Sequence, residues 1–230
     1  MYKVGVLLSG CGVMDGSEIH EAVLTLLCLD KEGIQAVCIA PDKDQTQVIN
    51  HLTNKPVNEK RNILVESARI ARGNIKDIKQ VIPSELDAVI LPGGFGAACN
   101  LSSFAKDGLN VKIMPEVESF LLEMNKLKRP IGAICIAPNI VAKLFGNKNI
   151  ELTIGNDQNT ANNLEKMGAK HINKEADGIV IDNKNLIVTT PAYMLAKGPS
   201  EVEAGISKLV KAIIELVKSS KVHFAASKAN

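Results

Sequence analysis

Aromatic residues are scarce in this sequence. It contains no tryptophan, and aromatic residues make up only 3% of its 230 residues. Lysine and arginine are spread along the chain, and the formal net charge is only +2. Proteins that bind nucleic acids usually combine a basic stripe with aromatic side chains that stack on bases. The sequence therefore argues against a nucleic-acid partner.

Long hydrophobic runs are also missing, since no apolar stretch approaches the length of a membrane span. A strand-like run begins directly after Lys3, which leaves no room for a signal peptide. We therefore expect a soluble protein with no membrane partner.

The five cysteines form no Cys-x-x-Cys pair, and no group of histidines and cysteines has zinc-site spacing. An odd, scattered set of this kind indicates free thiols in a reducing compartment. We expect a cytoplasmic protein with no metal and no cofactor, although a mature form in an organellar matrix also fits. Cys28 and Cys38 lie in apolar stretches, where we expect them to fill the core.

Short apolar runs alternate with longer segments of helical periodicity, which is typical of a parallel sheet covered by helices. Hydrophobic residues make up 46% of the chain, and no linker-like stretch divides it. We predict a single α/β domain over residues 1–218 and a flexible tail over residues 219–230. The predicted strands are Lys3–Leu8, Gln35–Ala40, Asp87–Leu91, Pro130–Ile134 and Leu152–Ile154, with a β-hairpin of Gly178–Ile181 and Leu186–Thr189.

The first predicted helix begins after Ser17 as its N-cap and ends at Gly33. We expect its buried face to carry Ile19, Ala22, Val23, Leu26 and Leu27. Residues 42–61 are polar and predict a long surface excursion, with room for a hairpin. The other predicted helices are Ile63–Ala71, Val111–Leu127, Pro138–Phe145, Asn156–Met167 and Ser200–Lys218.

Cys135 lies where an apolar strand gives way to a helix that Pro138 opens. On such an elbow we expect the thiol to be lifted out of the sheet, above the positive end of the helix. That field favours the thiolate, which is the reactive form. The alternative is a buried core cysteine without chemistry.

Glycine-rich turns follow two other predicted strands, at Ser9–Glu21 and Pro92–Asn100. Strand ends of a parallel sheet meet at one edge, and glycines there let backbone N–H groups approach a ligand. We predict that the N–H groups of Gly94 and Ile136 form an oxyanion hole. The alternative is a pair of turns that merely end strands. Neither turn has a phosphate-binding glycine motif.

Glu18 and Glu21 lie three residues apart in the first helix and share a face. Both complement the helix dipole, and a glutamate that faced Cys135 in a desolvated site would gain a raised pKa. We select Glu21 as the proton donor, with Glu18 in support. No histidine is obviously placed to pair with Cys135, and His171 is the strongest of the weak candidates.

At these residues the chain resembles the PfpI/ThiJ superfamily, and within it the ElbB-like, isoprenoid-biosynthesis amidotransferase-like branch. The resemblance extends from about Tyr2 to Lys218. The motifs that carry it are Ser9-Gly10-Cys11-Gly12, Asp15-Gly16-Ser17-Glu18-Ile19, Pro92-Gly93-Gly94-Phe95-Gly96-Ala97-Ala98, Cys135-Ile136-Ala137-Pro138 and Thr189-Thr190-Pro191-Ala192-Tyr193-Met194.

The resemblance implies a flavodoxin-like three-layer sandwich, an elbow cysteine at Cys135, a neighbouring acid at Glu21 and oxyanion donors at Gly94 and Ile136. It also implies homodimers and, for some members, a glyoxalase activity that needs no glutathione. Many members carry histidine where this chain has Ile136. The amidotransferases need a downstream His–Glu pair, and the chain has no His-x-Glu. We therefore do not expect glutamine hydrolysis.

Two function classes follow from the sequence. The first is a slow glyoxalase in which Cys135 adds to a small aldehyde. The predicted oxyanion and substrate-binding residues are Gly93, Gly94, Ile136, Cys11 and Glu18. The second is a cysteine-based redox sensor in which Cys11 serves as the resolving thiol. A non-catalytic regulatory binding protein of isoprenoid biosynthesis is a weaker variant of the second class.

Overall fold

The computed structural model describes the backbone of residues 1–227 and the side chains of residues 1–220. A seven-stranded sheet with the order β10-β11-β7-β6-β1-β2-β5 forms its centre. All neighbouring strands are parallel except β10 and β11, which form the predicted antiparallel hairpin. The strands of this sheet are β1 (Lys3–Leu7), β2 (Gln35–Ala40), β5 (Ile75–Asp77), β6 (Ala88–Leu91), β7 (Ile131–Ile134), β10 (Val180–Asp182) and β11 (Ile187–Thr190).

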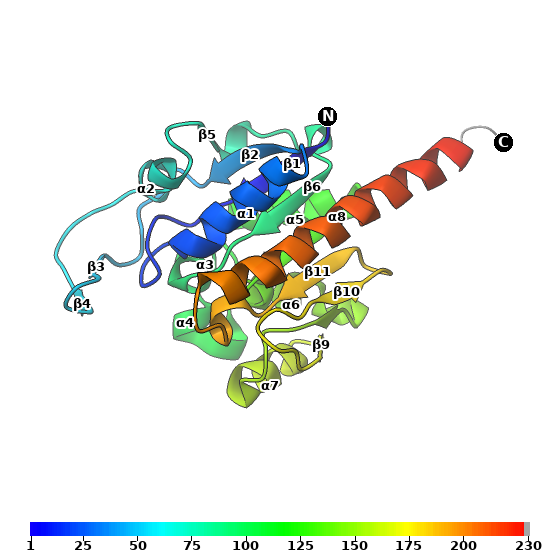
Figure 1. The fold of residues 1–230 in the computed structure, drawn as a ribbon. Helices are drawn as coiled ribbons and strands as arrows, with labels where there is room; N and C mark the ends of the chain where they lie inside the picture. The colour runs from blue at the N-terminus through cyan, green and yellow to red at the C-terminus, as the bar shows by residue number, and fades with distance from the viewer. Residues whose placement is uncertain (228–230) are drawn as a thin grey trace.

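Helices cover both faces of the sheet, as Figure 1 shows. On one face, the core contains residues of α1 (Ile19–Lys31), α2 (Ile63–Ile70) and α8 (Pro199–Ser227). The core of the other face contains residues of α5 (Pro115–Lys126), α6 (Pro138–Phe145) and α7 (Gln158–Lys166). The predicted three-layer α/β sandwich is therefore confirmed.

Smaller elements complete the fold. The polar excursion after β2 holds the short antiparallel pair β3 (Ile49–Asn50) and β4 (Lys55–Pro56), and the pair β8 (Glu151–Leu152) and β9 (Lys170–His171) is parallel. Two short helices follow β6, namely α3 (Phe95–Cys99) and α4 (Phe104–Asp107). Among the described residues, no helix is both long and apolar enough to cross a bilayer.

The first helix differs from its prediction in two ways. Its N-cap is Glu18 rather than Ser17, because the Glu18 side chain accepts a hydrogen bond from the N–H of Glu21. Its buried residues are Glu21, Ala22, Thr25, Cys28 and Leu29. The predicted inward residues Ile19, Val23 and Leu27 are instead 43%, 46% and 42% exposed. The inward face of α1 thus carries an acid and a hydroxyl among its apolar residues.

Other elements also differ from their predicted bounds. Strand β5 was not predicted, since its sequence Ile-Lys-Asp is short and largely polar. Helix α5 begins at Pro115 rather than at Val111, which lies in the core ahead of the helix. Helix α8 continues beyond Lys218 to Ser227, and residues 228–230 of the predicted tail lie outside the described residues. Cys28 and Cys38 are buried, as predicted.

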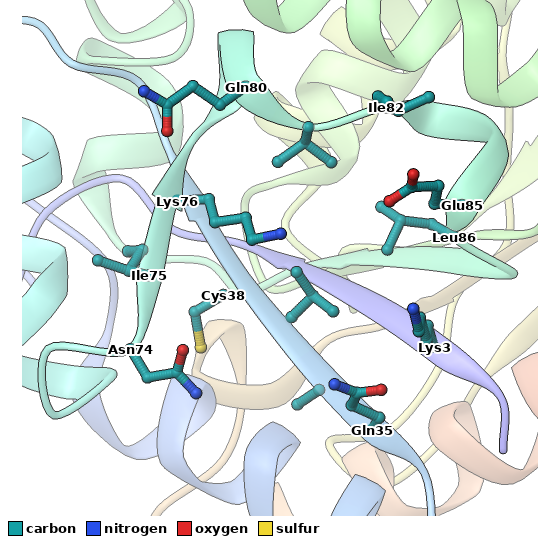
Figure 2. Close-up of a pocket in the computed structure, with 13 residues that line it drawn as sticks. Lys3, Gln35, Cys38, Asn74, Ile75, Lys76, Gln80, Ile82, Glu85 and Leu86 are labelled. Carbon is teal, nitrogen blue, oxygen red and sulfur yellow. The ribbon is translucent and has the colours of Figure 1, made fainter.

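A cavity of about 150 Å³ opens beside the edge strand β5, and Figure 2 shows the residues that line it. Lys3 and Gln35, which begin β1 and β2, place this cavity near the amino ends of those strands. Ligands of open parallel sheets bind beyond the carboxyl ends of the strands. The candidate site therefore has to be sought at the opposite edge.

Candidate active site

The carboxyl ends of β7, β6 and β1 lie side by side, because these strands are neighbours in the sheet. The turn after β1 and the turn after β6 are rich in glycine, and the Cys135 elbow follows β7. The two glycine turns contact each other directly, since the N–H of Gly96 donates to the carbonyl oxygen of Gly16 at 2.9 Å. All three predicted motifs thus meet at one edge of the sheet.

Cys135 has a φ of 61°, in the left-handed region that non-glycine residues rarely occupy. Its backbone N–H donates to the carbonyl oxygen of Thr190 at 2.9 Å, which ties the elbow to the end of β11. The N–H groups of Gly94 and Ile136 both hydrogen-bond to its side chain. The predicted pair of backbone donors therefore converges on the sulfur.

Glu21 is completely buried and reaches the elbow from α1. Its Oε2 accepts a hydrogen bond from the N–H of Gly93 at 2.9 Å, and its Oε1 accepts one from the N–H of Tyr193 at 3.2 Å. Its carboxyl group also hydrogen-bonds to the side chain of Cys135. Of the two predicted glutamates, Glu21 is the one that contacts the thiol.

Gly93 lies between the acid and the thiol. A Cβ atom at this position would approach the Cβ of Cys135 to 2.5 Å and Oε2 of Glu21 to 2.7 Å. Real Cβ atoms essentially never come so close to other heavy atoms. Only a glycine therefore fits at residue 93 without a shift of the residues around it.

Burial raises the pKa of Glu21 to about 8, and the negative charge of Glu18 acts in the same direction. The N–H donors of Tyr193 and Gly93 oppose this rise because they stabilise the carboxylate. Burial also raises the pKa of the Cys135 thiol well above its ordinary value, and the charge and hydrogen bond of Glu21 add to that rise. At neutral pH the pair is therefore mostly uncharged.

The predicted thiolate at Cys135 is wrong. The prediction rested on the helix dipole, whose effect on a nearby charge is about 0.3–1 kcal/mol. Full burial can shift a pKa by ~3–5 units, which is several times larger. Cys135 is only 8% exposed, and its closest titratable partner is an acid rather than a base. Desolvation therefore outweighs the dipole, and the N–H groups of Gly94 and Ile136 only partly offset it.

Glu18 supports the site from the start of α1. Its Oε2 accepts the N–H of Glu21 at 2.7 Å, and its own N–H donates to the carbonyl oxygen of Gly93 at 3.0 Å. Its side chain also lines the cavity above Cys135. Glu18 thus caps the start of α1 at Glu21, and its charge raises the pKa of the Glu21 carboxyl group.

A cavity of about 350 Å³ opens above the elbow, and Cys135 and Ile136 form part of its lining. Most of the other lining side chains are apolar, among them Phe95, Phe104 and Met194. Sequence reasoning did not identify Tyr193, which also lines the cavity and whose hydroxyl lies 2.7 Å from Nδ1 of His20. Only its place in the Thr189–Met194 motif could have pointed to it.

The structure separates Cys11 and His171 from the Cys135 site. Cys11 faces the charges of Glu66 and Arg69, and it does not belong to the cavity lining. His171 accepts the N–H of Ile154 at Nε2, and burial lowers its pKa. The site accordingly has no histidine partner for the thiol among residues 1–220.

Asn100 fastens the first glycine turn to the polar excursion. It is 4% exposed, and its Nδ2 donates to the carbonyl oxygens of Ser9 at 2.9 Å and Asp15 at 2.8 Å. Its Oδ1 accepts from both the N–H and the hydroxyl of Thr46. All hydrogen-bonding groups of this amide are satisfied, as its deep burial requires.

Residues able to hold a metal do not gather anywhere in the described part of the chain, where no three His, Cys, Asp or Glu side chains form a suitable group. The functional groups of the site are instead one thiol, two carboxyl groups, a phenol and a set of backbone donors. This set can perform nucleophilic addition and local proton transfer.

Comparison with known proteins identifies the family of this chain. A model of the DJ-1/PfpI family matches residues 11–197. The chain is 44% identical over 224 residues to the rat protein named "ES1 protein homolog, mitochondrial", a match that covers 93% of this chain and 84% of the rat protein. The human "Glutamine amidotransferase-like class 1 domain-containing protein 3, mitochondrial" is 43% identical, with 93% and 83% covered.

Solved structures with a similar fold were also found. A crystal structure described as an isoprenoid biosynthesis protein with an amidotransferase-like domain, from Ehrlichia chaffeensis, superposes with a TM-score of 0.89 at 40% identity. The match covers 94% of this chain and 100% of that one. Drosophila melanogaster DJ-1beta shares the fold with a TM-score of 0.54 at 16% identity, over 95% of this chain and 96% of its own.

Proposed function

The chain belongs to the DJ-1/PfpI family, and on that premise we propose that it is a glyoxalase that needs no glutathione. It would convert glyoxal or methylglyoxal to the corresponding hydroxy acid through a hemithioacetal on Cys135. One observation carries the proposal: a carboxyl group with a pKa of about 8 hydrogen-bonds to a thiol on a strained elbow, at the wall of a cavity. A group with this pKa can both take and return a proton near neutral pH.

In the first step, the sulfur of Cys135 attacks one aldehyde carbon of glyoxal while the thiol proton passes to ionised Glu21. A carbon–sulfur bond forms and the carbonyl π bond breaks, which leaves an alkoxide. The N–H groups of Gly94 and Ile136, which hydrogen-bond to the sulfur in the free protein, can stabilise this oxygen beside it. Glu21 then returns the proton to the oxygen, and the hemithioacetal is complete.

In the second step, the Glu21 carboxylate removes the hydrogen from the carbon bound to sulfur. The electron pair forms a carbon–carbon double bond, and the neighbouring carbonyl becomes an enediolate whose oxygen takes the proton of the hydroxyl on the carbon bound to sulfur. Return of the proton to the second carbon gives the thioester of glycolic acid. Water then breaks the carbon–sulfur bond, so that glyoxal and one water yield glycolic acid and the free thiol.

Turnover should be slow and should rise with pH up to about 8. The addition step requires that either Cys135 or Glu21 has lost its proton. At neutral pH the raised pKa of both groups keeps this pair uncharged in most molecules. General acid–base catalysis is worth typically ~10²–10⁴-fold, and here Glu21 alone would supply it.

The test measures glycolate formed from glyoxal in D₂O without glutathione, by proton NMR. The wild-type protein should give glycolate with one deuterium on its second carbon, because Glu21 exchanges its proton with solvent. Cys135→Ser should give only the background rate. Glu32→Gln, an exposed change at the other end of α1, serves as the control. A wild-type rate equal to that of Cys135→Ser would contradict the proposal.

Two further expectations remain proposals. The rat and human relatives are named as mitochondrial proteins, which supports an organellar matrix as the compartment over the cytoplasm. A homodimer is expected from the family, and sedimentation velocity at micromolar concentration tests it. A monomer under those conditions would contradict it.

A further inference from the structure

We propose that the cavity beside β5, which we name the edge cavity, binds a small zwitterionic α-amino acid with a branched aliphatic side chain. Valine has the size that fits. The edge cavity lies near the amino ends of β1 and β2, so it is separate from the Cys135 site at the carboxyl ends of the strands. The proposal rests on how this cavity forms, on its apolar floor and on the charged side chains at its rim.

The edge cavity exists because β5 is shorter than β2. Strand β5 pairs only with Cys38–Ala40, the second half of β2. The first half, Gln35–Val37, pairs with β1 on one side, and no strand of the described residues pairs with it on the other. The N–H of Gln35 donates to the carbonyl oxygen of Tyr2 on the β1 side, so the backbone groups of the next residue, Ala36, point to the open side. Ala36 lines the cavity, where these groups can pair with a ligand.

The floor of the edge cavity is apolar. Val37, Val81 and Leu86 line it, and each either belongs to the hydrophobic core of this face of the sheet or packs against it. Val81 and Leu86 come from residues 78–86, which connect β5 to β6. The volume is about 150 Å³, and an apolar cavity of ~150 Å³ holds one benzene molecule. The space therefore fits one branched alkyl group whose polar atoms lie at the rim.

Side chains of both charges lie at the rim. Lys3, Lys76 and Glu85 line the edge cavity, and all three are exposed. In Figure 2 the Lys76 side chain extends from β5 across the cavity, toward the side where Lys3 and Glu85 lie. None of these three side chains forms an ion pair or a hydrogen bond within residues 1–220. Separate positive and negative groups around one small cavity match a ligand that carries both charges itself.

Each part of an amino acid finds a partner in this arrangement. The α-carboxylate would pair with Lys3 and Lys76, and the α-ammonium would pair with Glu85. The isopropyl group of valine would cover the apolar floor, and the amides of Gln35 and Gln80 could donate further hydrogen bonds at the rim. A simple carboxylate would leave Glu85 without a cation, and the two lysines would repel a simple amine. Because exposed ion pairs are weak, we expect a dissociation constant in the millimolar range.

The experiment titrates the full chain with L-valine, isovalerate and isobutylamine and follows the backbone amide signals by NMR. Isovalerate is valine without its amino group, and isobutylamine is valine without its carboxylate. With valine, the signals of Ala36, Lys76 and Val81 should shift saturably, whereas those of Gly94 and Ile136 at the Cys135 site should not. The dissociation constant should be about two- to fivefold higher for each of the other two compounds, because each loses an exposed ion pair.

Two variants test the assignment of the charges. Lys76→Gln should weaken the binding of valine and isovalerate about two- to fivefold without weakening that of isobutylamine. Glu85→Gln should weaken the binding of valine and isobutylamine without weakening that of isovalerate. Lys60→Gln and Glu32→Gln are the matched controls, because both residues are exposed and lie outside the edge cavity.

Equal affinity for the three compounds, or unchanged valine binding in both variants, would overturn the proposal. An absence of saturable shifts at tens of millimolar valine would overturn it too, since Lys76 would then serve only to keep the edge strand from pairing with other chains. Cys135→Ser should bind valine as the wild type does. The outcome is therefore independent of the proposed glyoxalase activity.

Discussion

The carboxyl group of Glu21 and the thiol of Cys135 hydrogen-bond to each other inside the protein, and no cation is among the main causes of either pKa shift within the described part of the chain. The charge and the hydrogen bond of Glu21 raise the pKa of the Cys135 thiol, because a second negative charge in the same buried space would be repelled, whereas the hydrogen bond from Cys135 lowers the pKa of Glu21. The pair therefore titrates as a unit, and its first proton leaves near pH 8. The pH dependence of the site follows from this contact.

Removal of the Glu21 charge should make Cys135 easier to ionise. In Glu21→Gln the charge and the carboxyl hydrogen bond that raise the thiol pKa are absent, although burial still raises it. The midpoint of the pH profile for alkylation of Cys135 by iodoacetamide should therefore move to lower pH. Glu32→Gln should leave the profile unchanged, and a midpoint that rises in Glu21→Gln would show that the carboxyl group stabilises the thiolate.

The folded protein should lose stability as pH rises from about 5 to 8. Glu21 has an ordinary pKa of 4.5 and a folded pKa of about 8, so in this window the folded state holds a proton that the unfolded state has released. Its contribution is fully present below pH 4.5 and decreases by up to about 1.4 kcal/mol per pH unit. Urea denaturation of wild type and Glu21→Gln at pH 5.5 and 7.5 measures the difference. If the free energy of unfolding changed with pH equally in the two proteins, the raised pKa of Glu21 would be refuted.

A methyl group at residue 93 should disrupt the pair. In Gly93→Ala the new Cβ would overlap the Cβ of Cys135 and Oε2 of Glu21, and overpacking of this kind costs about 1–3 kcal/mol. Gly198→Ala is the matched control, because nothing lies within 4 Å of a Cβ built there. The midpoint temperature of thermal unfolding should fall clearly for Gly93→Ala and change little for Gly198→Ala. Similar midpoints for both would mean that the site has more room than these distances allow.

Peroxide should not turn this protein into a disulfide switch. Sensor cysteines are exposed and have a low pKa, whereas Cys135 is buried and its pKa is raised. Cys11 lies against Glu66 and Arg69, outside the cavity. Peptide mapping after peroxide treatment at pH 7 should therefore show no Cys11–Cys135 bond and slow oxidation of Cys135, which speeds up as pH rises. Rapid formation of that disulfide would instead favour the redox-sensor hypothesis.

The architecture was largely predictable from local patterns. Short apolar runs predicted six of the seven strands of the main sheet, including the two strands of the β10–β11 hairpin. The exception was β5, where Lys76 and Asp77 hide a strand that pairs only with β2. A polar edge strand has no apolar periodicity from which to predict it.

Helix α1 shows why the site was harder to predict. Two apolar stripes run along it, one through Ile19, Val23 and Leu27 and one through Ala22 and Leu29, and periodicity alone cannot choose between them. The second stripe faces inward together with Glu21 and Thr25. The Thr25 hydroxyl is satisfied within the helix, since it donates to the carbonyl oxygen of Glu21 at 2.7 Å.

The ionisation state of Cys135 could not be predicted from the sequence, for a different reason. The position of the elbow and the identity of the acid follow from local motifs, but burial depends on how α1, the glycine turns and the segment around Tyr193 pack over it. That packing decides whether the helix dipole or desolvation dominates. Only the folded arrangement could settle the sign of the pKa shift.

The hydrogen bonds that Asn100 makes to the excursion and to the first glycine turn have a consequence for motion. Because this one amide holds Thr46 of the excursion and the carbonyls of Ser9 and Asp15, neither segment can open alone without leaving a buried polar group unpaired. The surface excursion and the rim of the cavity should accordingly exchange their amide hydrogens as one cooperative unit. Local opening of the distant part of the excursion would therefore also loosen the residues at the mouth of the cavity.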